Sequence, residues 1–304
     1  MDIEFKENYE IKNLTSFKIG GTVKKIYFPK SQTEFLHLIK TEKDYIVLGS
    51  CSNVLFSSQG YDGIIICTTK MNRMEFRGTK VIAECGVRGP LLSQKALDAG
   101  LTGFEFMIGF PGSVGGNMFM NAGAHSQSIS DTLSLACLYD KEKDDVVYLD
   151  NSMMEFGYRH SILQSGRYIA LGAEFDLRKE NKKTIKELMD RNLEFRKNIQ
   201  PPLNYPNAGS VFKNPEHDSA GRLLDKAGVK DFDLPRAAVW QKHANFIINK
   251  GDATSEDILE LMLLMYKKVK NMYTIELVPE IRFIGKMNKH EEEICQELYK
   301  KNQK

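Results

Sequence analysis

A short loop in the last third of the chain, NYPNAGSVFKNP at residues 204–215, carries side chains that can take part in chemistry. Glycine, proline and asparagine dominate it, which predicts a loop or turn. Within it, Ser210 offers a hydroxyl and Lys213 a positive charge, with Phe212 between them. A hydroxyl in such a turn either bonds to its own backbone or is aimed at a substrate. Taken by itself, the loop favours the first interpretation.

Two further loops are rich in glycine and serine. LGSCSNVLF (48–56) directly follows an apolar strand pattern, and GFPGSVGGNMFMNAGAHSQSISD covers residues 109–131. Small residues let backbone N–H groups approach a ligand, and consecutive N–H groups form an anion-binding nest. Neither loop has the spacing G-x-G-x-x-G or G-x-x-x-x-G-K-[ST], which argues against a Rossmann or P-loop site. The loops are therefore either tight turns or two grips on one pyrophosphate.

The composition is that of a globular protein. The 304 residues are 42% hydrophobic and 27% charged, and the length predicts two or three domains. A net charge of +2 argues against nucleic acid as a partner. Five widely spaced cysteines and the absence of metal-ligand spacing predict neither disulfides nor a metal site, and favour the cytoplasm. No signal region or apolar run of about 20 residues is present, so no membrane association is expected.

Periodicity indicates a mixed α+β fold. We predict helices over residues 31–40, 90–100, 181–200 and 254–270. We predict strands over residues 45–49, 63–68, 80–86, 167–178 and 275–285, and a hairpin over 132–150. Ser31 with Glu34 forms an expected capping box, and Thr254 is an expected helix cap. The tail after residue 285 is expected to be a solvated or frayed helix, and Pro201-Pro202 marks a domain boundary.

Seven motifs, in the same order along the chain, resemble those of the UDP-N-acetylenolpyruvoylglucosamine reductase (MurB) family. They are NLTSFKIGG (13–21), LGSCSNVLF (48–56), GFPGSVGGNMFMNAGA (109–124), FGYRHS (156–161), YPNAGSVFKNP (205–215), KHANFIIN (242–249) and PEIRFIG (279–285). The resemblance implies an α+β fold with a two-part FAD-binding unit of the vanillyl-alcohol-oxidase (PCMH) type and a smaller substrate domain. The implied subdomains are 1–70 and 71–198 for FAD, with 273–304 packed against the second, and 199–272 for substrate.

The resemblance also implies a reaction. It is the reduction of UDP-N-acetylglucosamine enolpyruvate to UDP-N-acetylmuramate in peptidoglycan precursor synthesis, with bound FAD and with NADPH as hydride donor. The expected partner is a small UDP-sugar, and no protein partner is implied. The implied cofactor-binding residues are Gly49, Ser50, Cys51, Ser52, Asn53, Gly109, Pro111, Gly112, Ser113, Gly116, Asn121, Ala122 and Gly123.

Three residues are similar to the family's catalytic groups. Ser210 matches the proton donor to the carbon beside the substrate carboxylate, which is basic enough for a neutral, well-aimed hydroxyl to serve. Arg159 matches the arginine that holds this carboxylate as negative charge develops. Glu280 matches the third group, and partial burial is expected to raise its pKa. The alternatives are a surface ion pair for Arg159 and a structural pairing of Glu280 with Arg282.

Substrate contacts are carried over more loosely. Lys213 and Asn214 are candidates for the diphosphate and His243 is a candidate polar contact, while the other histidines are expected at the surface. Two departures from the family pattern stand out: Ser50-Cys51, where glycine is usual, and Trp240-Gln241, where a small or polar pair is usual. A positive φ at the first would be strained. A flavin oxidase or a non-catalytic flavin-binding protein are the rival functions, and the set Arg159, Ser210 and Glu280 argues against both.

Overall fold

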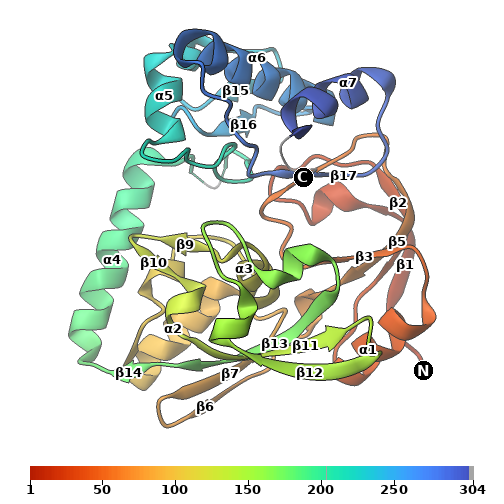
Figure 1. The fold of residues 1–304 in the computed structure, drawn as a ribbon, viewed down its shortest axis with the longest axis vertical. Coiled ribbons are helices and arrows are strands. Elements are labelled where there is room, and N and C mark those ends of the chain that lie inside the picture. Colours follow the sequence, from red (N-terminus) through yellow and green to blue (C-terminus); the bar gives the residue numbers. More distant parts are fainter. Residues whose placement is uncertain (203, 301–304) are drawn as a thin grey trace. The chain divides into compact units, whose positions relative to one another are not determined.

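The computed structural model describes residues 1–202 and 204–300, which form two compact units (Figure 1). Unit 1 contains Met1–Lys6, Ile26–Ser50 and Ile64–Arg196. Unit 2 contains Glu7–Lys25, Cys51–Gly63 and the described residues of Lys197–Lys304. Two early segments thus belong with the C-terminal part of the chain. The three-part division at residues 70, 198 and 272 stays a prediction.

Unit 1 is built on an antiparallel sheet with strand order β12-β11-β13-β7-β6 (Figure 1). Its strands are β6 (Met74–Arg77), β7 (Lys80–Glu84), β11 (Leu133–Asp140), β12 (Asp145–Asp150) and β13 (Tyr168–Asp176). The predicted hairpin is confirmed as β11 and β12, with Leu135 opposite Asp150 and Asp140 opposite Asp145. The predicted strands at 80–86 and 167–178 are β7 and β13.

Besides the helix at Gln32–Thr41, the described part of unit 1 contains three α-helices. They are α2 (Gly89–Ala99), α3 (Val114–Met120) and α4 (Lys182–Ile199), the last of which runs on into unit 2. Two short pairs, β8 (Leu101–Thr102) with β14 (Arg178–Lys179) and β9 (Gly123–Ala124) with β10 (Gln127–Ser128), complete this part. Apolar side chains of α2, α3 and the sheet share one buried core, in which Phe104 and Phe175 meet edge to face at 5.2 Å. The second loop is therefore anchored in packed structure.

A second sheet has strand order β1-β2-β5-β3. Its strands are β1 (Phe5–Glu10), β2 (Thr22–Tyr27), β3 (Tyr45–Leu48) and β5 (Tyr61–Cys67). In unit 1, β3 runs parallel to β5, with Tyr45 opposite Ile64. Before β3, α1 (Gln32–Thr41) begins at Ser31, whose hydroxyl accepts the N–H of Glu34 at 3.2 Å. The predicted cap at Ser31 is confirmed. The predicted capping box is not complete, because the Glu34 carboxylate accepts the N–H of Lys30 rather than that of Ser31.

Unit 2 is mainly helical and has its own apolar core. Its elements are β4 (Val54–Phe56), α5 (Ala220–Lys226), β15 (Ala237–Val239), β16 (Ile247–Asn249), α6 (Ser255–Tyr273), β17 (Arg282–Ile284) and α7 (Lys289–Leu298). β17 pairs in parallel with β4, and β15 pairs antiparallel with β16. The strand predicted over 275–285 is shorter than expected, because only its last residues pair with β4. The tail predicted as a solvated or frayed helix forms α7, and the prediction that it is solvated is wrong, because its apolar face is buried against α6.

Short 3-10 helices connect many of these elements. They are Ile11–Asn13, Thr68–Lys70, Glu105–Met107, Ile129–Asp131, Asn151–Met154, Ile162–Ser165 and Val229–Asp231. Within residues 1–202 and 204–300, no helix combines the length and apolar character needed to cross a membrane.

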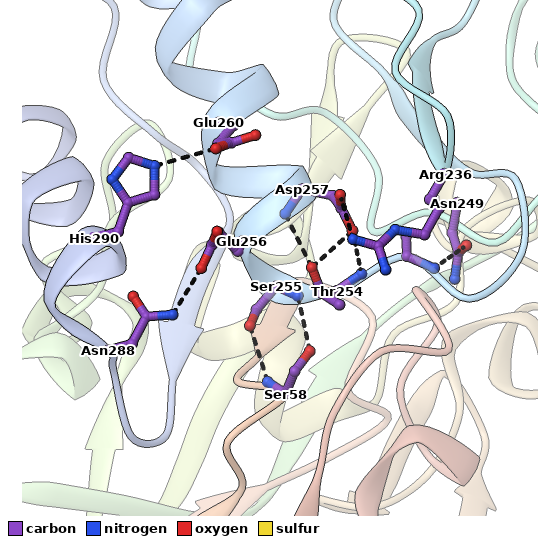
Figure 2. A network of polar contacts seen from close by, with 11 residues as sticks. Ser58, Arg236, Asn249, Thr254, Ser255, Glu256, Asp257, Glu260, Asn288 and His290 are labelled. Atoms are coloured by element: carbon purple, nitrogen blue, oxygen red, sulfur yellow. Dashed lines mark hydrogen bonds and ion pairs between the residues drawn. The ribbon is translucent and has the colours of Figure 1, made fainter.

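A polar network fixes the start of α6 inside unit 2 (Figure 2). Thr254 caps the helix as predicted: its hydroxyl accepts the N–H of Asp257 at 3.2 Å, and the Asp257 carboxylate accepts the N–H of Thr254 at 2.7 Å. Ser255 and Ser58 exchange two hydrogen bonds, each hydroxyl accepting the other's N–H at 2.9 Å. The Ser255 hydroxyl donates in turn to the buried carboxylate of Glu291 on α7 at 2.5 Å. The loop at Ser58, α6 and α7 are thereby tied together.

A buried carboxylate closes the corner where β11 ends and β13 begins. Asp140 accepts two hydrogen bonds from the Arg167 guanidinium, at 2.9 and 2.6 Å. It also accepts the backbone N–H groups of Glu142 and Lys143. The bonds from Arg167, opposed by burial and assisted by these N–H groups, lower the pKa of Asp140 to about 2. The ionised form is the one that the fold stabilises.

This corner predicts a defined loss of stability in acid. Since the folded-state pKa of Asp140 lies below the unfolded value of about 3.9, its contribution is complete above pH ~4 and is lost as the pH falls toward 2. Asp140→Asn should lower the free energy of unfolding at pH 7, and the gap to the wild-type protein should close between about pH 4 and pH 2. Urea unfolding at several pH values measures this gap. A gap that stays constant down to pH 2 would contradict the assignment.

Candidate active site

The two glycine-rich loops approach each other in unit 1. Gly49 follows β3, and Ser113 immediately precedes α3 in the second loop. A methyl group added to Gly49 would lie 2.1 Å from the Ser113 hydroxyl oxygen, so a side chain there would require Ser113 to move. Two backbone hydrogen bonds hold the second loop in place: the N–H groups of Val114 and Gly115 donate to the carbonyls of Val87 and Cys85, at 2.8 Å each. The loops are fixed in place by the protein itself.

Polar atoms at this meeting point are left without a protein partner. The hydroxyl oxygens of Ser50 and Ser113 are buried, and neither has a hydrogen-bond partner among the described residues. A buried hydroxyl without a partner costs about 1–3 kcal/mol, so such groups in a folded protein point to a ligand or bound water. These unpaired hydroxyls and the small residues around them are compatible with a polar ligand such as a pyrophosphate. The residues present fit a nucleotide cofactor.

Other predicted cofactor residues act first as structural links. Asn121 ends α3 at φ 40°, and its side-chain amide donates to the carbonyl of Gly157 at 3.0 Å. Ala122 accepts the N–H of Ile129 at 3.0 Å. Gly112 is buried, and a methyl group there would lie 2.1 Å from the side-chain oxygen of Asn117. Pro111 and Gly116 are exposed, which leaves them accessible to a ligand.

Arg159 lies on a tight turn beside the second loop. Gly157 and His160 exchange two backbone hydrogen bonds of 3.2 Å, which places Tyr158 and Arg159 at the tip. Arg159 has φ 55°, a left-handed conformation that a non-glycine residue adopts only at a cost. Its guanidinium donates to the carbonyl of Gly123 at 3.4 Å and lies over the Tyr158 ring at 5.1 Å. This geometry carries the cation to the loop that the sequence assigned to the cofactor.

The segment that follows Ser210 pairs in unit 2 with the segment that carries Glu280. Phe212 forms an antiparallel bridge with Pro279. The N–H of Glu280 donates to the carbonyl of Val211, and the N–H of Lys213 donates to the carbonyl of Val278, both at 2.8 Å. Glu280 therefore lies opposite Val211, the residue that follows Ser210. Gly209, at φ 81°, provides the bend before the serine.

Glu280 also contacts the part of the 48–56 loop that belongs to unit 2. The side-chain amide of Asn53 donates to the carbonyl of Glu280, and the N–H of Arg282 donates to the carbonyl of Asn53, both at 3.1 Å. Asn53 was predicted as a cofactor contact, and the structure shows it as a support for Glu280. Ser52 is half-buried beside it. Cys51 is buried at φ 50°, so the strain expected where glycine is usual is present.

The predicted substrate contacts have distinct surroundings in unit 2. The side-chain oxygen of Asn214 accepts the N–H of Ala220 at 3.1 Å and so anchors the start of α5. Lys213 is half-buried. His243 packs against Phe246 with ring centres 4.8 Å apart, and burial lowers its pKa. The other five histidines are exposed, as expected.

Trp240, one of the departures from the family pattern, anchors the segment that leads to the Ser210 loop. Its indole N–H donates to the carbonyl of Ile199 at 3.0 Å, and its ring lies 5.3 Å from that of Tyr205. Gln241 donates to the carbonyl of Lys230 at 2.7 Å. Both side chains are used within unit 2 itself.

Comparison with known proteins supplies the family. Residues 201–284 match the model of the UDP-N-acetylenolpyruvoylglucosamine reductase C-terminal domain, and residues 24–139 match that of an FAD binding domain. The UDP-N-acetylenolpyruvoylglucosamine reductase of Caldicellulosiruptor bescii is 43% identical over 289 residues, 93% of this chain and 91% of the relative. That of Caldicellulosiruptor saccharolyticus is 40% identical and covers 94% of this chain and 93% of its own length. The chain belongs to the UDP-N-acetylenolpyruvoylglucosamine reductase family.

The fold agrees with this membership. The crystal structure of the Thermus caldophilus UDP-N-acetylenolpyruvylglucosamine reductase (MurB) superposes with a TM-score of 0.80 at 30% identity. The superposition covers 93% of this chain and 99% of the other. The predicted α+β fold with an FAD-binding part is confirmed, and FAD is the cofactor. The roles of the individual residues remain predictions.

Two features of unit 2 lie apart from the reductase residues. Among residues 1–202 and 204–300, Glu256, Glu260 and His290 form a group whose ligand atoms lie within 4.8 Å of one another (Figure 2). Asn288 donates to Glu256 at 2.7 Å, and His290 lies 3.1 Å from Glu260, so packing of α7 on α6 accounts for the group. A surface hollow of about 830 Å³, lined in part by Lys12, Lys18 and Lys250, contains none of the predicted catalytic residues. Neither feature changes the assignment of the site.

Gly116 offers a direct test of where the cofactor binds. It is exposed in α3, and a methyl group there would meet only the Ser113 hydroxyl, at an ordinary 3.5 Å. Gly116→Ala should therefore leave the free energy of unfolding unchanged or slightly higher. If FAD lies against this face, overpacking should weaken its binding by about 1–3 kcal/mol, on the order of 5- to 150-fold in Kd. Flavin content after purification and titration with FAD measure the effect.

Gly115→Ala is the matched control. Its added methyl group would lie 3.0 Å from the Cys85 Cβ, so this variant should lose stability through the protein's own packing. Unaltered FAD affinity in Gly116→Ala would remove Gly116 from the cofactor contacts.

Proposed function

We propose that this chain reduces the enolpyruvyl ether of UDP-N-acetylglucosamine to UDP-N-acetylmuramate, with NADPH as the reductant, in the cytoplasm. Family membership over nearly the whole chain supports the reaction class. The observation that carries the proposal is the pairing of residues 211–213 with 278–280, which sets Ser210 and Glu280 on neighbouring segments. Bound FAD supplies hydride transfer between NADPH and the substrate. The chain's own residues must supply charge stabilisation and one proton.

Arg159 is assigned to the substrate carboxylate. Its guanidinium stays charged at all relevant pH values and can donate two parallel hydrogen bonds to a carboxylate. When hydride reaches the terminal methylene carbon, negative charge spreads over the neighbouring carbon and this carboxylate. A fixed cation stabilises that charge more than it stabilises the ground state, which is the condition for catalysis. The strained backbone at Arg159 supports a functional reason for its position.

Ser210 is assigned as the proton donor to that neighbouring carbon. Its Oγ–H bond breaks as the new C–H bond forms, and the serine then regains a proton from solvent. A hydroxyl serves because the acceptor carbon is strongly basic, provided that the hydroxyl is well aimed. Glu280 is assigned to hydrogen-bond the substrate carboxyl group in its protonated form. Its backbone is fixed on both sides, by Val211 and by Asn53.

Substrate binding is assigned to three further residues. Lys213 is proposed to contact the diphosphate, and Asn214 and His243 to provide polar contacts near it. Lys213 and Asn214 lie three and four residues after the proton donor, and the Asn214 side chain also sets the start of α5. A UDP-sugar would then place its charged end near Lys213 and its ether near Ser210.

One assay tests the whole proposal. The purified protein should be yellow, should bleach when NADPH is added without oxygen, and should regain its colour when the enolpyruvyl substrate is added. Mass spectrometry of the product should show the addition of two hydrogens. Recovery of colour with oxygen but not with the substrate would favour a flavin oxidase instead.

Ser210→Ala should separate the two halves of the reaction. Bleaching by NADPH needs no proton from Ser210, so its rate should stay within about twofold of the wild-type rate. Recovery of colour with substrate should slow by on the order of 10²–10⁴-fold, the usual contribution of a positioned proton donor. Stopped-flow absorbance follows both steps. Ser152→Ala, an exposed serine of unit 1, is the control; equal slowing of both steps in Ser210→Ala would end the proton-donor assignment.

Arg159→Ala should lower turnover by on the order of 10²–10³-fold, the typical cost of one preorganised electrostatic group. The flavin absorbance spectrum should be almost unchanged. Arg159→Lys should fall between, because an ammonium group keeps the charge but loses the paired geometry. Arg178→Ala, an exposed arginine on β14, controls for loss of one surface charge. Near-normal turnover in Arg159→Ala would return this residue to a surface role.

A further inference from the structure

Asn245 holds the segment that carries the proposed proton donor. Its side chain is 3% exposed. The side-chain oxygen accepts the N–H of Phe212 at 3.0 Å, and the side-chain amide donates to the carbonyl of Phe212 at 2.8 Å. Its own carbonyl accepts the N–H of Val211 at 2.9 Å. One residue therefore makes three hydrogen bonds to the two residues that follow Ser210.

These bonds complete the pairing of residues 211–213. The carbonyl of Val211 and the N–H of Lys213 bond to the 278–280 segment, and both polar groups of Phe212 bond to the Asn245 side chain. The asparagine amide thus takes the place of a neighbouring strand, offering one acceptor and one donor with suitable spacing. The backbone N–H of Asn245 donates to Nδ1 of His243 at 3.2 Å, which holds the backbone of Asn245 in place.

The residue type is specified by burial. Phe212 is 1% exposed, so its N–H and carbonyl cannot turn to water if the asparagine is lost. Leucine would leave both groups unpaired, and an ionised aspartate would face the carbonyl with a second acceptor. On the other side of Ser210 stands Gly209, at φ 81° and with open space around its Cα. The direction of the Ser210 hydroxyl therefore depends on the hydrogen bonds that Asn245 makes to the two residues after it.

We infer that Asn245 is a positioning residue for the reduction of the enolpyruvyl substrate, acting through Ser210. The inference rests on the proposed function of Ser210. Asn245 does not have to touch the substrate or the flavin: it fixes the backbone from which the proton donor projects. A misplacement of about 1 Å in a reacting group can cost on the order of 100-fold in rate.

Asn245→Asp, tested in the flavin-loaded protein, is the first variant. Bleaching by NADPH and the flavin spectrum should be unchanged, while recovery of colour with the enolpyruvyl substrate should slow about 10–100-fold. Amide hydrogen exchange, followed by mass spectrometry of a peptide that contains residues 211–213, should accelerate in the variant. Asn245→Ser, which leaves room for a bridging water, gives the same test if the aspartate variant does not fold.

Asn249 is the matched control. It is another buried asparagine four positions along the same segment, 5% exposed, but its side chain holds other loops, through Phe17, Gly251 and Ala253. Asn249→Asp should lower stability without slowing the substrate step selectively. If it slowed that step as much as Asn245→Asp does, general destabilisation would explain both and the inference would fail.

A double-mutant cycle with Ser210→Ala decides how Asn245 acts. If Asn245 works by aiming Ser210, Asn245→Asp should slow the substrate step little or not at all once the hydroxyl is gone. Two outcomes would overturn the positioning role: full additivity of the two effects, or no effect of Asn245→Asp in the protein that keeps Ser210. The two proposals fail separately. If Ser210→Ala did not slow the substrate step, the proton-donor role of Ser210 would fail. If Ser210→Ala slowed that step but the two effects were additive, only the positioning role of Asn245 would fail.

Discussion

The backbone of residues 211–213 crosses the core of unit 2, and its polar groups must find partners there. Val211 and Phe212 are 0% and 1% exposed, so water cannot pair with their N–H and carbonyl groups. The fold meets this requirement from two sides, with the 278–280 segment and with Asn245. Hydrogen bonding of a buried backbone thereby specifies where Ser210 and Glu280 lie. Stability of the core and geometry of the site have the same cause at this point.

Three residues that the family resemblance singled out share a left-handed backbone with ten other non-glycine residues of the described chain. Arg159 and Cys51 both adopt positive φ without being glycine, and Asn121 does so at the end of α3. Each such residue costs on the order of 1–3 kcal/mol, less for asparagine, whose short side chain tolerates the left-handed region better. The Arg159 turn is retained by the bond from Asn121 to Gly157 and by the paired bonds between Gly157 and His160. Local structure around the second loop offsets the cost of presenting the guanidinium.

Much of the fold could be predicted from local sequence, because its signals are local. The apolar stripe of α6 and the cap at Thr254, the charged turn between β11 and β12, and Gly100 after α2 each lie within a few residues of the element they define. The strand expected over 275–285 was overextended, since its pairing depends on residues 53–56 and 211–213, far away in the sequence. Residues 7–25 and 51–63 join unit 2 for the same reason. The pattern of apolar residues within a segment does not show which distant segment it will pair with.

The site shows the same limit more sharply. Ser210, Arg159 and Glu280 are predicted because motifs carry them, but the sequence assigns no supporting role to Asn245 and Asn53, although both lie inside motifs shared with the family. Their function is to bond backbone groups, which any sequence offers at every residue, so residue type alone gives no signal. The one available cue was the polar asparagine at 245, within the otherwise apolar run ANFII. A polar residue in a buried strand pattern has to bond something.

Buried hydroxyl groups in this chain separate structural roles from ligand binding. Ser255 is fully buried, and its hydroxyl bonds to both Ser58 and Glu291, so its function is complete within the protein. Ser50, Ser93 and Ser113 are buried without partners among the described residues. Ser93 lies in the core face of α2, which shows that a lone hydroxyl of this kind is not sufficient evidence for a ligand. Ser50 and Ser113 differ because each lies in a glycine-rich loop: Ser50 follows Gly49, and the Ser113 hydroxyl lies beside Gly49. Two unpaired hydroxyls in glycine-rich loops, both within the region matched by the FAD-binding family model, are compatible with a bound pyrophosphate, and bonds such as that from Val114 to Val87 hold the second loop in place.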